Sequence, residues 1–262
     1  MQRLTVNGQQ LEVRLITGPD TLAPIVFLHE GLGCVSMWTQ RGVDWPLDVC
    51  KATGRAGVVY SRRGYGQSAP APAGRNVLLG DYLHREAFDV LPALLAELHI
   101  DHPVLLGHSD GASIALLYAS QFAVAACIAM APHVLVESVA LDAIFQARRA
   151  FETGDLKHRL ARHHADVDGA FWQWNDVWLS SEFSSFDIRP ECGRIAAPLM
   201  LIQGTDDEYA SMHQLDEIAR VATQAQQIRL ASCGHSPHRD QSEKTLQAVA
   251  EFLEQVAPQT GG

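Results

Sequence analysis

The chain has 262 residues, of which 47% are hydrophobic and 19% are charged, and its formal net charge is −10. This length suits one α/β domain that buries a large core, with room for an insertion. Nucleic-acid binding requires clustered Lys and Arg, so the acidic balance argues against a nucleic-acid partner.

Targeting and redox signals point to an ordinary intracellular protein. Residues 1–8 lack the charged and then apolar order of a signal peptide, and the best apolar run, 123–131, is too short for a bilayer. The cysteines are odd in number and lack the spacing of a disulfide framework or a zinc pair; they are Cys34, Cys50, Cys127, Cys192 and Cys233. We therefore expect a cytoplasmic protein with reduced thiols and no membrane contact.

Short apolar strands alternate with helical patterns along the chain. Residues 4–6 and 11–16 flank an Asn7-Gly8 turn that is typical of a hairpin. The later predicted elements are strands at 25–28, 57–60, 104–106, 124–130, 198–202 and 227–230, and helices at 81–98 and 245–256. This alternation predicts the α/β class, with a mostly parallel sheet covered on both faces. The active site of such a sheet lies at the carboxyl ends of its strands.

Residues 137–190 interrupt this alternation. The segment has helical propensity and is rich in Trp and Phe. We interpret it as a helical cap inserted into one core domain that comprises residues 1–136 and 191–262. Most of its aromatic side chains should form the cap's own small core, whereas one or two, Trp174 among them, should line a substrate pocket.

The sequence Gly107-His108-Ser109-Asp110-Gly111 follows a predicted strand and precedes a helix-prone segment. This is the G-x-S-x-G pattern in the strand–turn–helix context of a nucleophilic serine. The turn is sharp, and glycines give room beside the serine because they have no Cβ. A chance match would be a glycine-flanked loop serine, so the pattern needs partners elsewhere in the chain.

A serine hydroxyl needs a base, and the base needs an orienting carboxylate. His235 follows the last predicted strand, at the same edge of the sheet as Ser109, and His238 is the alternative base. The acids Asp206, Asp207 and Glu208 follow the strand before it. They are usual in a solvated loop, but one of them fits the orienting role, which gives the chain order Ser109, Asp207, His235.

A tetrahedral intermediate also needs N–H donors. The backbone N–H of Asp110 is one candidate, and the glycine-containing loop 29–33 offers a second. No carboxylate or thiolate lies at ligand spacing from the histidines of the cap, so we expect no metal site; His158, His163 and His164 are expected to be solvated.

Together these motifs resemble the α/β-hydrolase superfamily over nearly the whole chain. The segment 28–33 resembles the His-Gly oxyanion loop of that family, although Glu30 stands where glycine is usual. Counting from His29 favours Gly31 over Leu32 as the donor. Residues 61–68 resemble the structural segment Asp-x-Arg-Gly-x-Gly-x-Ser, with Ser61 in place of aspartate.

The resemblance also implies several roles. The family's Gly-x-x-acid spacing selects Asp207, and Gly234-His235 fits its histidine loop. The segment 131–134 often lines the pocket in this family, so His133 is a candidate substrate contact, with a packed loop histidine as the alternative. The resemblance implies no cofactor.

The expected function is hydrolysis of an ester, thioester or lactone of a small, partly apolar molecule through an acyl-enzyme. The same residues also suit carbon–carbon bond hydrolysis or cofactor-free perhydrolysis. A slow-turnover ligand-binding receptor is the alternative from another class, and a non-catalytic scaffold fits the unbroken set of motifs less well.

Overall fold

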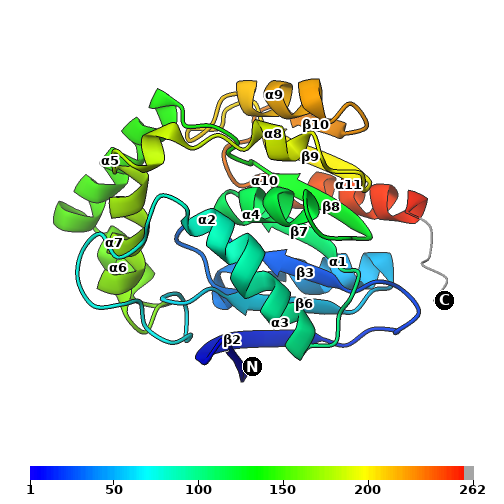
Figure 1. Ribbon diagram of the computed structural model, residues 1–262, viewed down its shortest axis with the longest axis horizontal. Helices are drawn as coiled ribbons and strands as arrows, with labels where there is room; N and C mark the ends of the chain where they lie inside the picture. The colour runs from blue at the N-terminus through cyan, green and yellow to red at the C-terminus, as the bar shows by residue number, and fades with distance from the viewer. Residues whose placement is uncertain (257–262) are drawn as a thin grey trace.

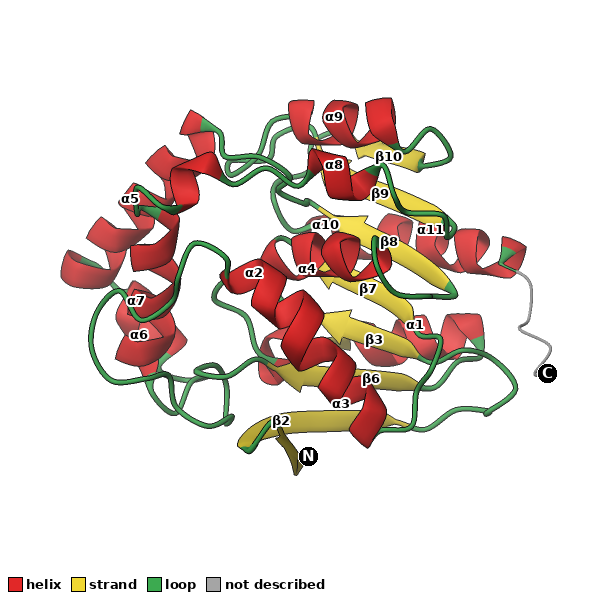
Figure 2. Ribbon diagram, viewed as in Figure 1, coloured by secondary structure: helices red, strands yellow, loops and turns green. Residues whose placement is uncertain are grey.

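The computed structural model describes residues 1–256, and an eight-stranded sheet forms its centre (Figures 1 and 2). Its strand order is β1-β2-β6-β3-β7-β8-β9-β10, and pairs from β6 to β10 are parallel, whereas β1/β2 and β2/β6 are antiparallel. The strands are β1 (Gln2–Val6), β2 (Gln9–Ile16), β3 (Ile25–Leu28), β6 (Gly57–Ser61), β7 (Val104–His108), β8 (Ala126–Met130), β9 (Leu199–Gly204) and β10 (Gln226–Leu230), beside the small pair β4 (Thr39–Gln40) and β5 (Val43–Asp44).

Helices cover both faces of this sheet, and a further group lies beyond its strand ends (Figure 1). The α-helices are α1 (Trp45–Thr53), α2 (Tyr82–Arg85), α3 (Leu91–Glu97), α4 (Asp110–Ala119), α5 (Ser138–Thr153), α6 (Leu156–Leu160), α7 (Val167–Trp178), α8 (Arg189–Cys192), α9 (His213–Val221), α10 (Pro237–Asp240) and α11 (Ser242–Gln255). The other helical segments are the 3₁₀ helices η1 (Val35–Trp38) and η3 (Phe183–Ser185) and the π-helical turn η2 (Glu86–Val90).

The two faces of the sheet form separate hydrophobic layers. Along β3, Val26 and Leu28 pack with α2, α3 and α4, whereas Ile25 and Phe27 pack with α1 and α11. Successive side chains of a strand point to opposite faces, so a continuous apolar run is the pattern of a strand buried on both sides. The predicted α/β class and mostly parallel sheet are therefore confirmed.

The predicted elements lie close to the observed ones, with ends that differ by up to three residues and one irregular turn inside a helix. Strand β8 begins at Ala126, two residues later than predicted. The predicted helix 81–98 is helical almost throughout but contains a π-turn, η2, directly before α3. Pro92 stands in the first turn of α3 and has no N–H to donate to the carbonyl four residues earlier, which explains the local change of hydrogen bonding.

Residues 137–190 form helices, as predicted, at the side of the molecule toward which β3, β6 and β7 point (Figures 1 and 2). Phe151 of α5 stacks on Phe171 of α7 with ring centroids 3.8 Å apart, so part of the aromatic content does form an internal core. The division into a core domain and a cap remains a prediction.

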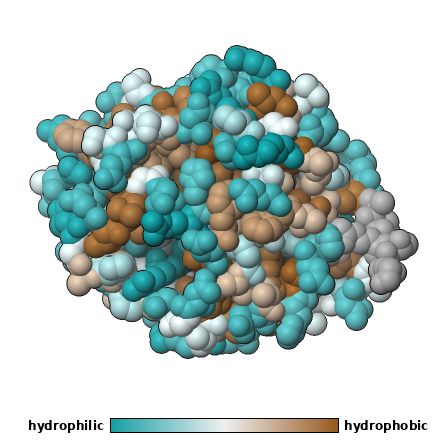
Figure 3. Space-filling model, viewed as in Figure 1, coloured by the Kyte–Doolittle hydropathy of each residue, from teal (hydrophilic) through white to brown (hydrophobic). Residues whose placement is uncertain are grey.

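The face drawn in Figure 3 mixes hydrophilic and hydrophobic side chains. Within residues 1–256, no helix combines the length and the apolar character that crossing a membrane requires. All five cysteines are buried, and none forms a disulfide bond.

Candidate active site

Ser109 lies at a strained turn between β7 and α4. Its backbone angles are φ 54° and ψ −119°, a conformation that non-glycine residues rarely adopt, and its N–H donates to the Met130 carbonyl at 2.9 Å. A Cβ at Gly107 would overlap the Gly111 backbone, and a Cβ at Gly111 would overlap the Leu28 carbonyl. Both glycines are therefore required for the close packing that holds this turn.

Three side chains from separate strand ends form one line of hydrogen bonds. Ser109 Oγ lies 2.9 Å from His235 Nε2, and His235 Nδ1 lies 2.9 and 3.0 Å from the two carboxylate oxygens of Asp207. Because Asp207 follows β9 and His235 follows β10, all three stand at the carboxyl edge of the parallel strands. The contacts require a proton on Nδ1 and leave Nε2 to accept the serine proton.

The Asp207 carboxylate is held by more than the histidine. Its Oδ1 accepts hydrogen bonds from the backbone N–H groups of Tyr209 and Ala210. Burial alone would raise the pKa of Asp207, but the hydrogen bond and charge of His235 and the Tyr209 amide bring it below its usual value. Asp206 accepts from Thr205 Oγ1 instead, so the two neighbouring acids have different partners.

His238, the alternative base, occupies a different environment. Its ring lies against those of Trp38, Trp45 and His108, with centroids 4.8 to 5.5 Å away. Among the described residues, neither ring nitrogen has a hydrogen-bond partner. Burial, together with the nearby charges of His108 and Arg239, lowers the pKa of His238 well below its usual value.

The main cavity beside Ser109 has a volume of about 400 Å³. Both proposed N–H donors, Gly31 and Asp110, line it together with Ser109 and His235. Its apolar wall comes from the loop after β3 and from α5 to α7, and consists of Leu32, Met37, Ile144, Leu156, Leu160, Trp174 and Trp178.

The structure places both predicted substrate contacts in this cavity. His133 is buried, and its ring centroid lies 5.7 Å from that of His235 and 4.9 Å from Trp178. Burial and the proximity of His235 lower the pKa of His133 to about 3, so its ring is neutral near pH 7. The Trp174 indole covers Gly31 so closely that a Cβ there would overlap its Nε1.

Sequence reasoning missed a set of donors around the Asp110 carboxylate. Tyr82 donates its hydroxyl at 2.7 Å and Trp178 its indole N–H at 3.2 Å, while Arg62 Nη1 lies 3.5 Å away. Arg62 also donates to the Glu30 carbonyl at 2.9 Å. The Asp110 side chain thus links α2, α7 and the segment after β6 next to Ser109.

Two departures from expectation have physical explanations. Ser61, which replaces the usual aspartate, donates to Glu12 Oε2 at 2.7 Å and accepts from the Val35 N–H, so β2 supplies the missing carboxylate. The expectation that His164 is solvated is wrong. His164 is buried, accepts from the Gly66 N–H at 2.9 Å and lies 3.0 Å from the Leu32 carbonyl, so it supports the loop after β3.

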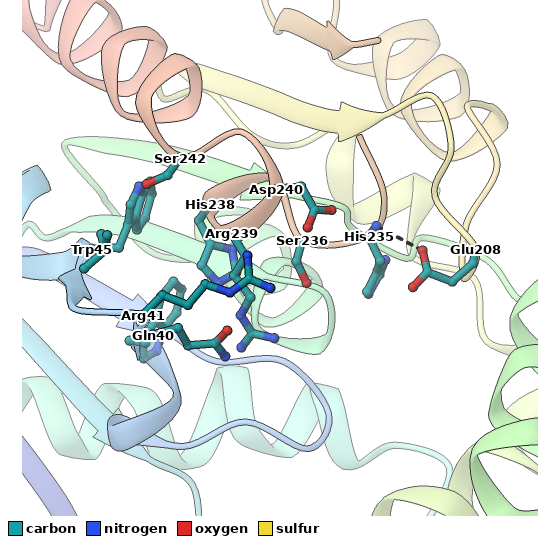
Figure 4. Close-up of a pocket in the computed structure, with 12 residues that line it drawn as sticks. Gln40, Arg41, Trp45, Glu208, His235, Ser236, His238, Arg239, Asp240 and Ser242 are labelled. Carbon is teal, nitrogen blue, oxygen red and sulfur yellow. Dashed lines mark hydrogen bonds between the residues drawn. The ribbon is translucent and has the colours of Figure 1, made fainter. Parts of the chain in front are cut away.

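A second cavity of about 320 Å³ is also lined by His235 (Figure 4). In this view, His238 and Arg239 lie between Trp45 and His235. The two cavities share Glu208, His235, Ser236 and Arg239. No cluster of three potential metal ligands occurs within residues 1–256.

Comparison with protein families decides the classification. Residues 25–248 match the model described as "Alpha/beta hydrolase family". The chain belongs to this alpha/beta hydrolase family. The match includes Ser109, Asp207 and His235, and it confirms the expected resemblance.

Individual members of the alpha/beta hydrolase family are distant in sequence. The sn-1-specific diacylglycerol lipase ABHD11 of Mus musculus is 25% identical, over 93% of this chain and 85% of its own. The enol-lactonase of Burkholderia xenovorans LB400 has a TM-score of 0.75 at 20% identity, covering 97% of this chain and 100% of that one. A structure from a study of carboxylesterases of Nitrososphaera gargenis has a TM-score of 0.75 at 19% identity, covering 97% and 98%.

Proposed function

We propose that the protein is a serine hydrolase that cleaves an ester, thioester or lactone of a small, partly apolar substrate through an acyl-enzyme. The observation that carries this proposal is the continuous hydrogen-bonded line from Ser109 Oγ through His235 to Asp207. The similarity to a protein named as a diacylglycerol lipase, an enzyme that cleaves ester bonds, also supports the proposal.

The geometry suits acyl transfer in two halves. Ser109 Oγ attacks the substrate carbonyl carbon while His235 Nε2, at 2.9 Å, takes its proton. The protonated imidazole then gives this proton to the leaving oxygen or sulfur as the carbonyl–heteroatom bond breaks. Water hydrolyses the acyl-enzyme with the same base, and Asp207 holds the imidazole in the required tautomer throughout.

The backbone N–H groups of Gly31 and Asp110 are the proposed donors to the tetrahedral oxyanion. The Glu30 carbonyl accepts from His29 Nδ1 at 2.7 Å, Arg62 Nη2 at 2.9 Å and the Gly33 N–H at 3.0 Å. In a trans peptide the C=O and the following N–H point in opposite directions. These three contacts therefore fix the direction of the Gly31 N–H, which is the preorganisation that oxyanion stabilisation requires.

The cavity walls define the proposed substrate contacts. A volume of about 400 Å³ with a largely aliphatic and aromatic wall suits a small, partly apolar acyl group. Trp174, whose Nε1 covers Gly31, lies beside the proposed oxyanion position, and neutral His133 lines the cavity near His235. We assign both to substrate positioning.

A panel of p-nitrophenyl esters, thioesters and lactones tests the reaction class. The wild-type protein should turn over at least one class, and Ser109→Ala should reduce kcat on the order of 10⁶-fold if the three residues act as a unit. Retention of wild-type esterase activity by Ser109→Ala would refute the proposal. Tight binding of these compounds without turnover would favour the receptor alternative instead.

A further inference from the structure

Glu30 lies between the loop that carries Gly31, the proposed oxyanion donor, and the segments that carry Ser109 and His235. It precedes Gly31 in the loop after β3, where the family usually has glycine, and its carboxylate lies at the wall of the main cavity. One carboxylate oxygen, Oε1, accepts from Arg239 Nη2 at 2.5 Å. The other, Oε2, lies 3.5 Å from His108 Nδ1.

Both groups beside this carboxylate belong to segments that carry the proposed nucleophile and base. His108 immediately precedes Ser109, and its Nε2 donates to the His235 backbone carbonyl at 2.7 Å, since a carbonyl can only accept. Arg239 lies on α10, four residues beyond His235 (Figure 4). Arg239 therefore connects Glu30 to the segment that carries His235, whereas the neutral His108 ring only packs beside the carboxylate.

We propose that Glu30 is a positioning residue that holds the Gly31 N–H in register with Ser109 and His235. The inference rests on the proposed function, because it assigns Gly31 to the oxyanion. A glycine at this position would leave the loop without the side-chain ion pair to Arg239. In this chain the Glu30 carboxylate joins the loop of the proposed oxyanion donor to the segment of the base. The three contacts on the Glu30 carbonyl set the orientation of the Glu30–Gly31 peptide.

A direct chemical role for Glu30 is less compatible with its contacts. Burial alone would raise the pKa of Glu30, but the nearby charge of Arg239 brings it well below its usual value. The carboxylate is therefore ionised near neutral pH and has no proton to give a leaving group. Its ion pair with Arg239 joins the loop after β3 to α10, and this link is the role we assign to it.

The test compares Glu30→Gln, Arg239→Lys and Arg239→Gln with the wild-type protein on the best ester of the panel. Because the oxyanion contact forms only in the transition state, Glu30→Gln should lower kcat by about 10- to 100-fold and change KM by less than about twofold. Arg239→Lys, which keeps the charge, should retain more activity than Arg239→Gln. Adding Arg239→Gln to Glu30→Gln should cost little further activity, because the two residues act through one contact.

Asp168→Asn is the matched control. It also removes one carboxylate from an ion pair, with Lys157, but this pair is exposed and joins α6 to α7, and neither residue lines the main cavity. It should leave kcat and KM unchanged. Thermal unfolding and titration of reactive serine with a fluorophosphonate correct each kcat for the folded, competent fraction.

The outcomes separate this inference from the proposed function. If Ser109→Ala is inactive while Glu30→Gln and Arg239→Gln keep wild-type kcat, the positioning role is wrong and the proposed function survives. A change in KM alone, or a loss of kcat that disappears after correction for the folded fraction, also overturns the role. If Ser109→Ala remains active, the proposed function itself fails.

Discussion

His235, in the loop after β10, and His238, on α10, stand three residues apart and have opposite surroundings. His235 has a serine hydroxyl on one ring nitrogen and a carboxylate on the other, and it faces the cavity beside Ser109. His238 is packed between two tryptophans and His108, without a described partner for either nitrogen.

The comparison shows that neighbours, rather than residue type, decide what a histidine can do. Asp207 keeps one nitrogen of His235 protonated and favours the imidazolium that forms when the other accepts a proton. Apolar neighbours oppose any charge on His238, so it is a poor base for catalysis. We expect His235 to act in the reaction and His238 to fill space behind it.

The largest expected effect separates the two histidines directly. His235→Ala should reduce kcat on the order of 10⁶-fold, because the base and the serine act as one unit. His238→Phe preserves a planar ring against Trp38 and Trp45 and should keep kcat within about tenfold of wild type, since volume-conserving replacements are tolerated best. Steady-state kinetics on one ester checks both, and equal losses would break the distinction.

A smaller effect distinguishes the neighbouring acids. Asp207→Asn should reduce kcat by about 10⁴-fold, because an amide cannot stabilise the imidazolium and favours the wrong tautomer. Asp206→Asn changes a residue whose partner is Thr205 and should have little effect. The same assay on purified, folded variants measures both. If Asp206→Asn carries the loss instead, Asp207 is the wrong acid.

The smallest expected effect concerns stability and pH. The folded pKa of His238 is far below the value near 6.5 of an unfolded histidine, so below about pH 6.5 the unfolded state binds more protons. The free energy of unfolding therefore falls as the pH drops below that value. His238→Phe should make this dependence shallower by up to about 1.4 kcal/mol per pH unit.

Urea unfolding of the wild-type protein and His238→Phe between about pH 5 and pH 8 measures this difference in slope. The pKa values of His29, His108, His133 and His164 are also lowered by burial, so a residual slope of the same sign should remain. Parallel curves for the two proteins would mean that His238 does not contribute to it.

The local patterns predicted the strands and the positions of Ser109, Asp207 and His235. Ser109 directly follows β7, Asp207 and His235 lie within five residues of the ends of β9 and β10, and parallel strands bring their carboxyl ends to one edge. The position of each residue shortly after a strand was therefore enough to predict that the three lie at one edge of the sheet. The π-turn before α3 also had a local signal, since Pro92 lacks the donor that a regular helix needs.

Side-chain convergence from distant segments was beyond the reach of such patterns. Nothing near Asp110 in sequence indicates that Tyr82 and Trp178 donate to its carboxylate. The replacement of an aspartate by Ser61 is balanced by Glu12, which lies on another strand. His164 carries no local mark of burial, because its partners come from the loops after β3 and β6.

The most direct test of the central claim is mass spectrometry of the protein after reaction with a fluorophosphonate. The account predicts one adduct per chain, on the peptide that contains Ser109, formed as the Oγ–phosphorus bond replaces the phosphorus–fluorine bond. Ser109→Ala should take up none, and His235→Ala should react far more slowly than His238→Phe. An unmodified wild-type Ser109, or equally fast labelling of His235→Ala, would contradict the account.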